Sequence, residues 1–139
     1  MSVFGDISYA EVFTDGSCHE GDNAHLARAG WGVFYGEGSP YNFAAALDGP
    51  VQTSYRAELK AVVHVLRQVI SPTLIMCDCQ SVVNTLNRIL DEKQLPDKLR
   101  ENDLWEQIME LTDNLDHTQI GIQWMPGHLD DKTKAEKRK

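Results

Sequence analysis

The feature that most constrains the fold is a change of hydrophobic pattern near residue 53. Before it, three short stretches suited to strands follow one another on short links, at 9–15, 29–36 and 41–47. Strands joined by such links pair antiparallel. After it, longer stretches with helical periodicity alternate with short apolar runs, which is typical of crossover connections and parallel strands. The sequence therefore predicts an α/β chain with a mixed sheet whose first three strands are antiparallel.

The second half of the chain predicts three helices and two strands. No proline or glycine occurs from 53 to 70, where valines recur at helical spacing, and 80–90 carries an apolar stripe on one helical face. A third helix is predicted to begin with Asp103 as its N-cap and Glu106 as its capping-box partner. The two predicted strands lie at 73–78 and 119–125.

Length and composition fit one domain, because 139 residues with 42% hydrophobic content can bury a sizeable core. No apolar run approaches the ~20 residues of a membrane span, and the N-terminus lacks a signal-type pattern. We therefore expect an intracellular protein, cytoplasmic or nuclear, that is monomeric and has no membrane partner. Three cysteines form no disulfide framework, and Cys77 is interpreted as a small buried residue rather than a zinc ligand, since CxxC spacing is absent.

The net charge of −8 argues against a basic surface for nucleic acid. Five of the 13 Lys and Arg residues lie in the last eight positions, so the remainder is still more acidic. If the chain before this C-terminal segment binds phosphates, we expect bound cations to mediate the contact. We accordingly divide the chain into a domain at 1–128 and a basic, mobile tail at 129–139.

Two aspartates follow apolar runs that are predicted to be strands. Asp15 comes directly after Val12–Thr14, and Asp78 comes directly after the apolar part of the strand at 73–78. The carboxyl ends of parallel strands form the usual binding edge of an open α/β sheet. We therefore expect the two carboxylates to lie side by side at that edge.

A third carboxylate, Glu58, falls on the sheet-facing stripe of the helix at 53–70, one turn before Val62. The opposite stripe of this helix is wholly polar and is expected to face solvent; it consists of Arg56, Lys60, His64 and Arg67. Three clustered carboxylates repel one another unless a hard divalent cation neutralises them. Oxygen ligands of this kind suit Mg²⁺ or Mn²⁺, so the three acids predict a metal site.

Each of these acids also has an ordinary structural interpretation. Asp15, followed by glycine and serine, is typical of a turn, and Asp78 of a residue that starts a helix. Glu58 could be an acid favoured by the helix dipole in an N-terminal turn. A phosphate-loop nucleotide site, suggested by the letters TDGS, lacks the glycine-lysine-threonine sequence that it needs. The convergence of three acids with a glycine-histidine loop after the last strand favours the metal site.

The chain resembles the type 1 ribonuclease H family in six segments that follow the family's order over nearly the whole sequence. These segments are VFTDGSC, AGWGVFY, TSYRAELKAV, IMCDCQSVV, NDLWEQI and IQWMPGH. The resemblance implies a ribonuclease H-like fold with a five-stranded mixed sheet flanked by helices. It also implies an endonuclease that hydrolyses the RNA strand of RNA–DNA hybrids and leaves 5′-phosphate and 3′-hydroxyl ends.

The same resemblance assigns roles to individual residues. Asp15, Glu58 and Asp78 match the first three metal-binding carboxylates of the family, in agreement with the pattern described above. His128 matches the family's mobile histidine, which assists proton transfer or product release. Two Mg²⁺ ions, for which Mn²⁺ can substitute, are implied when substrate is bound. The family's hybrid-contacting segments match Gly16, Ser17, Cys18, Ser54, Arg56 and Gln80.

The C-terminal sequence departs from the family pattern. After the histidine loop the family has an alanine-aspartate pair that opens a last helix and supplies a fourth metal ligand, but no such pair follows His128. The connection at 91–102 also lacks the tryptophan- and lysine-rich handle of bacterial-type members, as is typical of retroelement domains that work beside a reverse transcriptase in one polypeptide. Two interpretations follow: an active hybrid nuclease, or a catalytically impaired module with a structural or hybrid-binding role.

Overall fold

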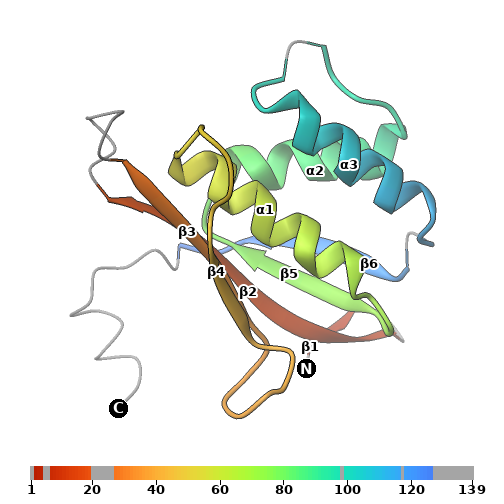
Figure 1. Cartoon of the computed structure of the whole chain (residues 1–139). Helices are drawn as coiled ribbons and strands as arrows, with labels where there is room; N and C mark the ends of the chain where they lie inside the picture. The colour runs from red at the N-terminus through yellow and green to blue at the C-terminus, as the bar shows by residue number, and fades with distance from the viewer. Residues whose placement is uncertain (1, 5–6, 20–26, 98, 117, 127–139) are drawn as a thin grey trace.

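A computed structural model describes residues 2–4, 7–19, 27–97, 99–116 and 118–126 (Figure 1). The strands are β1 (Ser2–Phe4), β2 (Ile7–His19), β3 (Arg28–Phe34), β4 (Phe43–Ala46), β5 (Thr73–Cys77) and β6 (Ile120–Trp124). The helices are α1 (Ser54–Arg67), α2 (Gln80–Glu92) and α3 (Asn102–Asp113). The main sheet has the order β4-β3-β2-β5-β6, and β1, which the sequence did not predict, pairs with the start of β2.

The sheet is mixed, as predicted. β2, β3 and β4 pair antiparallel, whereas β5 is parallel to both β2 and β6. All three helices lie on one side of this sheet (Figure 1). α1 packs on β2 and β3, α2 packs on β5 and β6, and α3 packs on α1. The five-stranded mixed sheet is therefore confirmed, with its described helices on one face.

The core lies between the sheet and the helices. Because successive side chains of a strand alternate between faces, Val12 and Thr14 of β2 point to the helices and are buried, whereas Phe13 and Asp15 point to the outer face. Phe13 and its ladder partner Phe34 are 40% and 49% exposed. Within the described ranges, no helix covers this outer face (Figure 1).

The predicted end of the strand at Asp15 is wrong. β2 continues to His19, because residues from Asp15 to His19 pair with β3, and this pairing gives their backbone groups partners. Asp15 is therefore not a turn residue. The parallel pairing of β2 with β5, however, ends at Thr14 and Cys77. Asp15 and Asp78 thus follow the last paired positions of two neighbouring strands.

The predicted capping box of the third helix is also wrong. α3 begins at Asn102, and its N-cap is Glu101, whose φ of 57° is left-handed and whose side chain makes no capping hydrogen bond. Asp103 lies in the first turn, where its carboxylate accepts hydrogen bonds from Arg56. This tertiary contact replaces the local one that the spacing suggested.

No helix in the described part of the chain combines the length and the apolar character needed to cross a membrane. The histidine loop, the predicted tail at 129–139 and any last helix lie outside the described residues.

Candidate metal centre

Glu58 reaches the sheet because the first turns of α1 lie directly on the backbone of β2. Thr53 is the N-cap of α1, and its side chain accepts a hydrogen bond from the Arg56 amide at 3.1 Å. A Cβ atom added at Gly16 of β2 would lie 2.5 Å from the backbone nitrogen of Glu58 and 2.9 Å from the carbonyl carbon of Ala57. Only glycine therefore allows this approach, which leaves the Glu58 side chain 5% exposed.

Both carboxylate oxygens of Glu58 have protein partners. The Gly16 amide donates to Oε1 at 2.9 Å, and the Cys77 thiol donates to Oε2 at a Sγ–O distance of 3.9 Å. Burial, followed by the negative charge of Asp78, raises the pKa of Glu58 to about 8, whereas the Gly16 hydrogen bond opposes this rise. Without a cation, Glu58 therefore holds a proton at neutral pH.

Asp78 directly follows β5 and lies beside Glu58. Glu58, Cys77 and Asp78 each offer one potential ligand atom, and these atoms lie within 4.8 Å of one another. The end of β6 holds the same turn, because Met125 donates its amide to the Cys77 carbonyl at 3.0 Å. The indole Nε1 of Trp124 donates to the Asp78 carbonyl at 3.2 Å. The structure thus places Glu58 beside Asp78, two of the three acids that were expected to cluster, whereas the pair expected to lie side by side was Asp15 and Asp78.

Asp15 approaches this edge of the sheet from the other face. Its side chain is exposed on the outer face of β2 and lies outside the 4.8 Å group of the described residues. Its negative charge nevertheless contributes to the raised pKa of Glu58, less than that of Asp78. The three predicted carboxylates are therefore near one edge but not equivalent: Glu58 and Asp78 form the group, and Asp15 lies beside it.

The donor set fits a hard divalent cation. Carboxylate oxygens are the preferred ligands of Mg²⁺ and Mn²⁺, and the raised pKa of Glu58 shows that a further negative charge is unfavourable here without a cation. Burial raises the pKa of the Cys77 thiol to about 12, so this side chain stays protonated and donates a hydrogen bond rather than binding a hard cation. Glu58 and Asp78 thus fit a metal ion, and Asp15 beside them stays the predicted third ligand.

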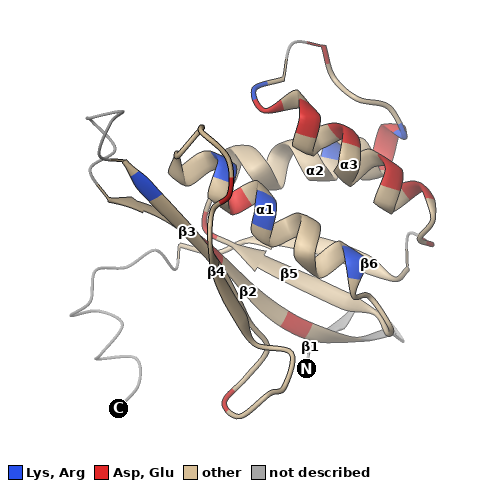
Figure 2. Cartoon of the chain, in the orientation of Figure 1, with Lys and Arg blue, Asp and Glu red and all other residues tan. Residues whose placement is uncertain are grey.

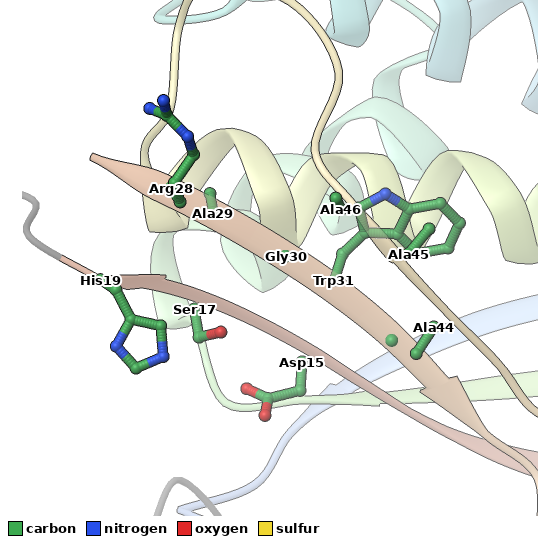
Figure 3. Close-up of a pocket in the computed structure, with 11 residues that line it drawn as sticks. Asp15, Ser17, His19, Arg28, Ala29, Gly30, Trp31, Ala44, Ala45 and Ala46 are labelled. Atoms are coloured by element: carbon green, nitrogen blue, oxygen red, sulfur yellow. The ribbon is translucent and has the colours of Figure 1, made fainter. Parts of the chain in front are cut away.

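An open groove of about 570 Å³ lies on the outer face of β2, β3 and β4 and includes Asp15 (Figure 3). Asp15, Ser17 and His19 follow one another along β2 on this face, and Arg28 lies at the far end with His19 (Figure 3). The rest of the lining is made mostly of small residues, among them Gly30, Gly32, Ala44 and Ala46. The groove was not predicted, because it depends on how three strands align.

Two of the predicted substrate-binding residues have other partners. Gly16 is buried, and its amide is used by Glu58. Arg56 pairs with Glu101 at 2.6 Å and with Asp103 at 2.9 Å, and its side chain is 18% exposed. Gly16 thus serves the packing of α1, and Arg56 joins α1 to α3. Their contact with a substrate stays a prediction.

The polar stripe of α1 does not simply face solvent either. His64 lies between rings of the sheet: its ring centroid is 4.9 Å from that of Phe43, with which it stacks, and 5.0 Å from that of Trp31. The stripe is partly covered because α1 lies between α3 and β3 and contacts both.

The other predicted substrate-binding residues lie on β2 and at the starts of α1 and α2. Ser17, Ser54 and Gln80 are exposed, the first beside Asp15 and the other two at the first positions of α1 and α2. Cys18 is half-buried, and its thiol donates to the Gln52 carbonyl at 3.2 Å. Their contact with a substrate stays a prediction. His128 lies outside the described residues.

Sequence reasoning missed the contributions of Gly16 and Trp124. The role of Gly16 had a signal, because residues 12, 14 and 16 share the inward face of β2 and a glycine there permits close helix packing. The Trp124 hydrogen bond had none, since it depends on the register of β6 on β5.

The sequence of the chain is similar to those of known proteins. A family model described as RNase H matches residues 8–137. Ribonuclease H1 of Mus musculus is 34% identical in an alignment of 131 residues in length, and the match covers 84% of this chain and 43% of that protein. Ribonuclease H of Schizosaccharomyces pombe is 27% identical over 124 residues, covering 86% of this chain and 47% of that protein. The chain thus spans less than half the length of these relatives.

Solved structures share the fold. The RNase H domain of PFV, determined in solution, has a TM-score of 0.65 and 22% identity, covering 91% of this chain and 87% of that domain. Prototype Foamy Virus Protease-Reverse Transcriptase has a TM-score of 0.68 and 21% identity, covering 99% of this chain and 20% of that one. The foamy viral protein in complex with an RNA/DNA hybrid has a TM-score of 0.67 and 19% identity, with 99% and 20% covered.

Proposed function

Because the chain belongs to the ribonuclease H family, we propose that it is a metal-dependent endonuclease that hydrolyses the RNA strand of RNA–DNA hybrids. The products would carry 5′-phosphate and 3′-hydroxyl ends. The observation that carries the proposal is the buried Glu58 carboxylate beside Asp78, at the edge that Asp15 reaches from the other face. Burial and the nearby charge of Asp78 together raise the pKa of Glu58 to about 8. Such a shift is costly for a purely structural pair and is typical of functional sites.

Asp15, Glu58 and Asp78 would hold Mg²⁺, or Mn²⁺ in its place. Two ions held by these carboxylates would supply Lewis-acid chemistry, which would activate a water and stabilise the leaving 3′ oxygen. The protein's own part is to present its carboxylates in a fixed geometry. The Gly16 amide and the Cys77 thiol hold the two oxygens of Glu58, which loses its proton when the site is filled.

His128 occupies the position that matches the family's histidine, and we assign to it proton transfer to the leaving oxygen or product release. An imidazole suits either task because it titrates near neutral pH. Ser17, Cys18, Ser54 and Gln80 lie on three elements, β2, α1 and α2, and are our proposed contacts to the hybrid.

The distribution of charged residues suggests that a second protein domain contributes to hybrid binding. Figure 2 shows acidic residues along α3 and the adjoining loop, whereas Lys and Arg of α1 and β3 are few. Electrostatic attraction to phosphates is therefore weak for this domain alone. A reverse transcriptase domain in the same polypeptide would supply further contacts, as the likeness to foamy virus protease-reverse transcriptase suggests.

The test is cleavage of a labelled RNA–DNA hybrid in Mg²⁺ and in Mn²⁺. Asp78→Asn removes one ligand charge with little change of shape and should lower the rate more than about 100-fold. Asp91→Asn, the same substitution at an exposed position of α2, is the matched control and should cut at the wild-type rate.

Equal rates for wild type and Asp78→Asn would exclude the proposed site. A wild-type chain that binds the hybrid but does not cut it, in either metal, would instead support the catalytically impaired module.

A further inference from the structure

Trp124 lies at the end of β6, beside the turn that carries Asp78. It is the register partner of Cys77, so its backbone lies next to the last residue of β5. Its indole Nε1–H donates to the Asp78 carbonyl at 3.2 Å, and its side chain is 41% exposed. Trp124, at the end of an edge strand, thus makes a hydrogen bond with the backbone of Asp78, a candidate metal ligand.

We propose that Trp124 is a positioning residue for the metal centre. Its indole N–H fixes the peptide group between Asp78 and Cys79. The backbone of Asp78 is thereby held so that its carboxylate points toward Glu58. This inference rests on the proposed function, because it assigns Trp124 a role in the same metal site.

The turn between β5 and α2 needs such an anchor. The ladder of β5 with β2 ends at Cys77, so Asp78 lies beyond that pairing. α2 begins after Cys79, whose side chain makes no capping hydrogen bond. The Met125 amide donates a hydrogen bond to the Cys77 carbonyl, and the Trp124 indole donates one to the Asp78 carbonyl. Two consecutive carbonyls before α2 are therefore bonded by the end of β6.

Small movements of this turn matter because the ligand atoms are close together. The Asp78 and Glu58 atoms lie in a group within 4.8 Å, and the negative charge of Asp78 is the second largest cause of the raised pKa of Glu58. Chelation requires both carboxylates to point at one position, and groups that hydrogen-bond the ligand residues set that direction. Loss of the indole bond would let the Asp78 peptide rotate and weaken chelation.

The experiment measures Mn²⁺ affinity of the full chain, without nucleic acid, by titration calorimetry. Trp124→Phe keeps an aromatic ring and removes the N–H donor. It should raise the Mn²⁺ dissociation constant about threefold to tenfold, as expected for the loss of one hydrogen bond near the ligands. Hybrid cleavage should fall at low Mn²⁺ and recover at high Mn²⁺, with an unchanged KM for the hybrid.

Trp105 provides a matched control. Its Nε1 donates to the Tyr55 hydroxyl, also at 3.2 Å, but this bond joins α3 to α1 and involves neither Asp78 nor Glu58. Trp105 is fully buried, so Trp105→Phe should lower the thermal midpoint of unfolding. It should leave the Mn²⁺ dissociation constant unchanged.

Three results would overturn the inference: equal Mn²⁺ affinity in Trp124→Phe and wild type, an equal loss in Trp105→Phe, or a change confined to the KM for the hybrid. The last result would mean that the exposed ring touches substrate instead. Failure of the proposed function is distinguishable, because a wild-type chain that binds no Mn²⁺ would contradict the metal site itself.

Discussion

At the scale of single residues, Gly16 links the packing of α1 to the chemistry of Glu58. Its missing side chain lets α1 approach β2, and its amide holds the Glu58 carboxylate that this approach brings in. The neighbouring Asp15 lies on the opposite face of the same strand. Two adjacent residues of β2 therefore act on the candidate centre from two sides.

Gly16→Ala should be strongly destabilising. The added Cβ would lie 2.5 Å from one backbone atom and 2.9 Å from two others, so α1 must move. Overpacking against backbone should lower the free energy of unfolding by about 2–3 kcal/mol, measured by urea denaturation. Gly30→Ala is the control, because its Cβ would lie 3.4 Å from the Ala45 carbonyl oxygen and should cost much less. Equal losses would contradict the close packing of α1.

The two acids of the group were predictable from the sequence, because each has a local signal. Glu58 is the one acid on an apolar helical stripe, and Asp78 follows a short buried strand. The contacts of Gly16, Arg56 and Trp124 were not found, since each joins segments far apart in the chain. Local spacing predicts which face a residue occupies but not which distant group it meets.

At the scale of elements, local patterns predicted α1, β5 and α2 within a few residues. They failed for β2, whose residues from Asp15 to His19 pair only with β3, and for the start of α3. At the start of α3, Arg56 forms ion pairs with both Glu101 and Asp103. The errors therefore lie where a tertiary partner competes with a local signal.

The C-terminus of α2 offers a stabilising substitution. Its C-cap, Lys93, has a left-handed φ of 57°, although its amide donates to the Ile89 carbonyl at 2.8 Å as a C-cap should. Lys93→Gly should relieve this backbone strain and raise the free energy of unfolding by about 0.5–1 kcal/mol. Lys93→Ala, which keeps the strain, should give no such gain. Thermal and urea unfolding of both variants check this, and a loss in Lys93→Gly would refute it.

At the scale of the whole molecule, the buried Glu58 couples stability to pH. Its pKa is 4.5 in the unfolded reference state and about 8 in the fold, so the folded chain binds the extra proton between these values. Without divalent cations, the free energy of unfolding should therefore fall as pH rises from about 4.5 to about 8 and then level off, by on the order of a few kcal/mol.

Urea denaturation across this pH range, in a chelator, measures the effect. Glu58→Gln should flatten the dependence, because the variant side chain does not titrate. Saturating Mg²⁺ should also reduce it, since metal binding to the ionised site stabilises the folded state. A slope that persists in Glu58→Gln would assign the pH dependence to other groups.

The pairing of β2 with β5 also has a consequence for synthesis on the ribosome. Asp15 emerges early, but its strand gains its parallel neighbour only when β5 has been made, and the Asp78 turn gains its indole anchor only when Trp124 has followed. Contacts of such long sequence separation form late because the intervening chain must first be ordered. A nascent chain that has not released β6 therefore has an unfinished sheet, and its Asp78 turn lacks both the β6 neighbour and the indole contact.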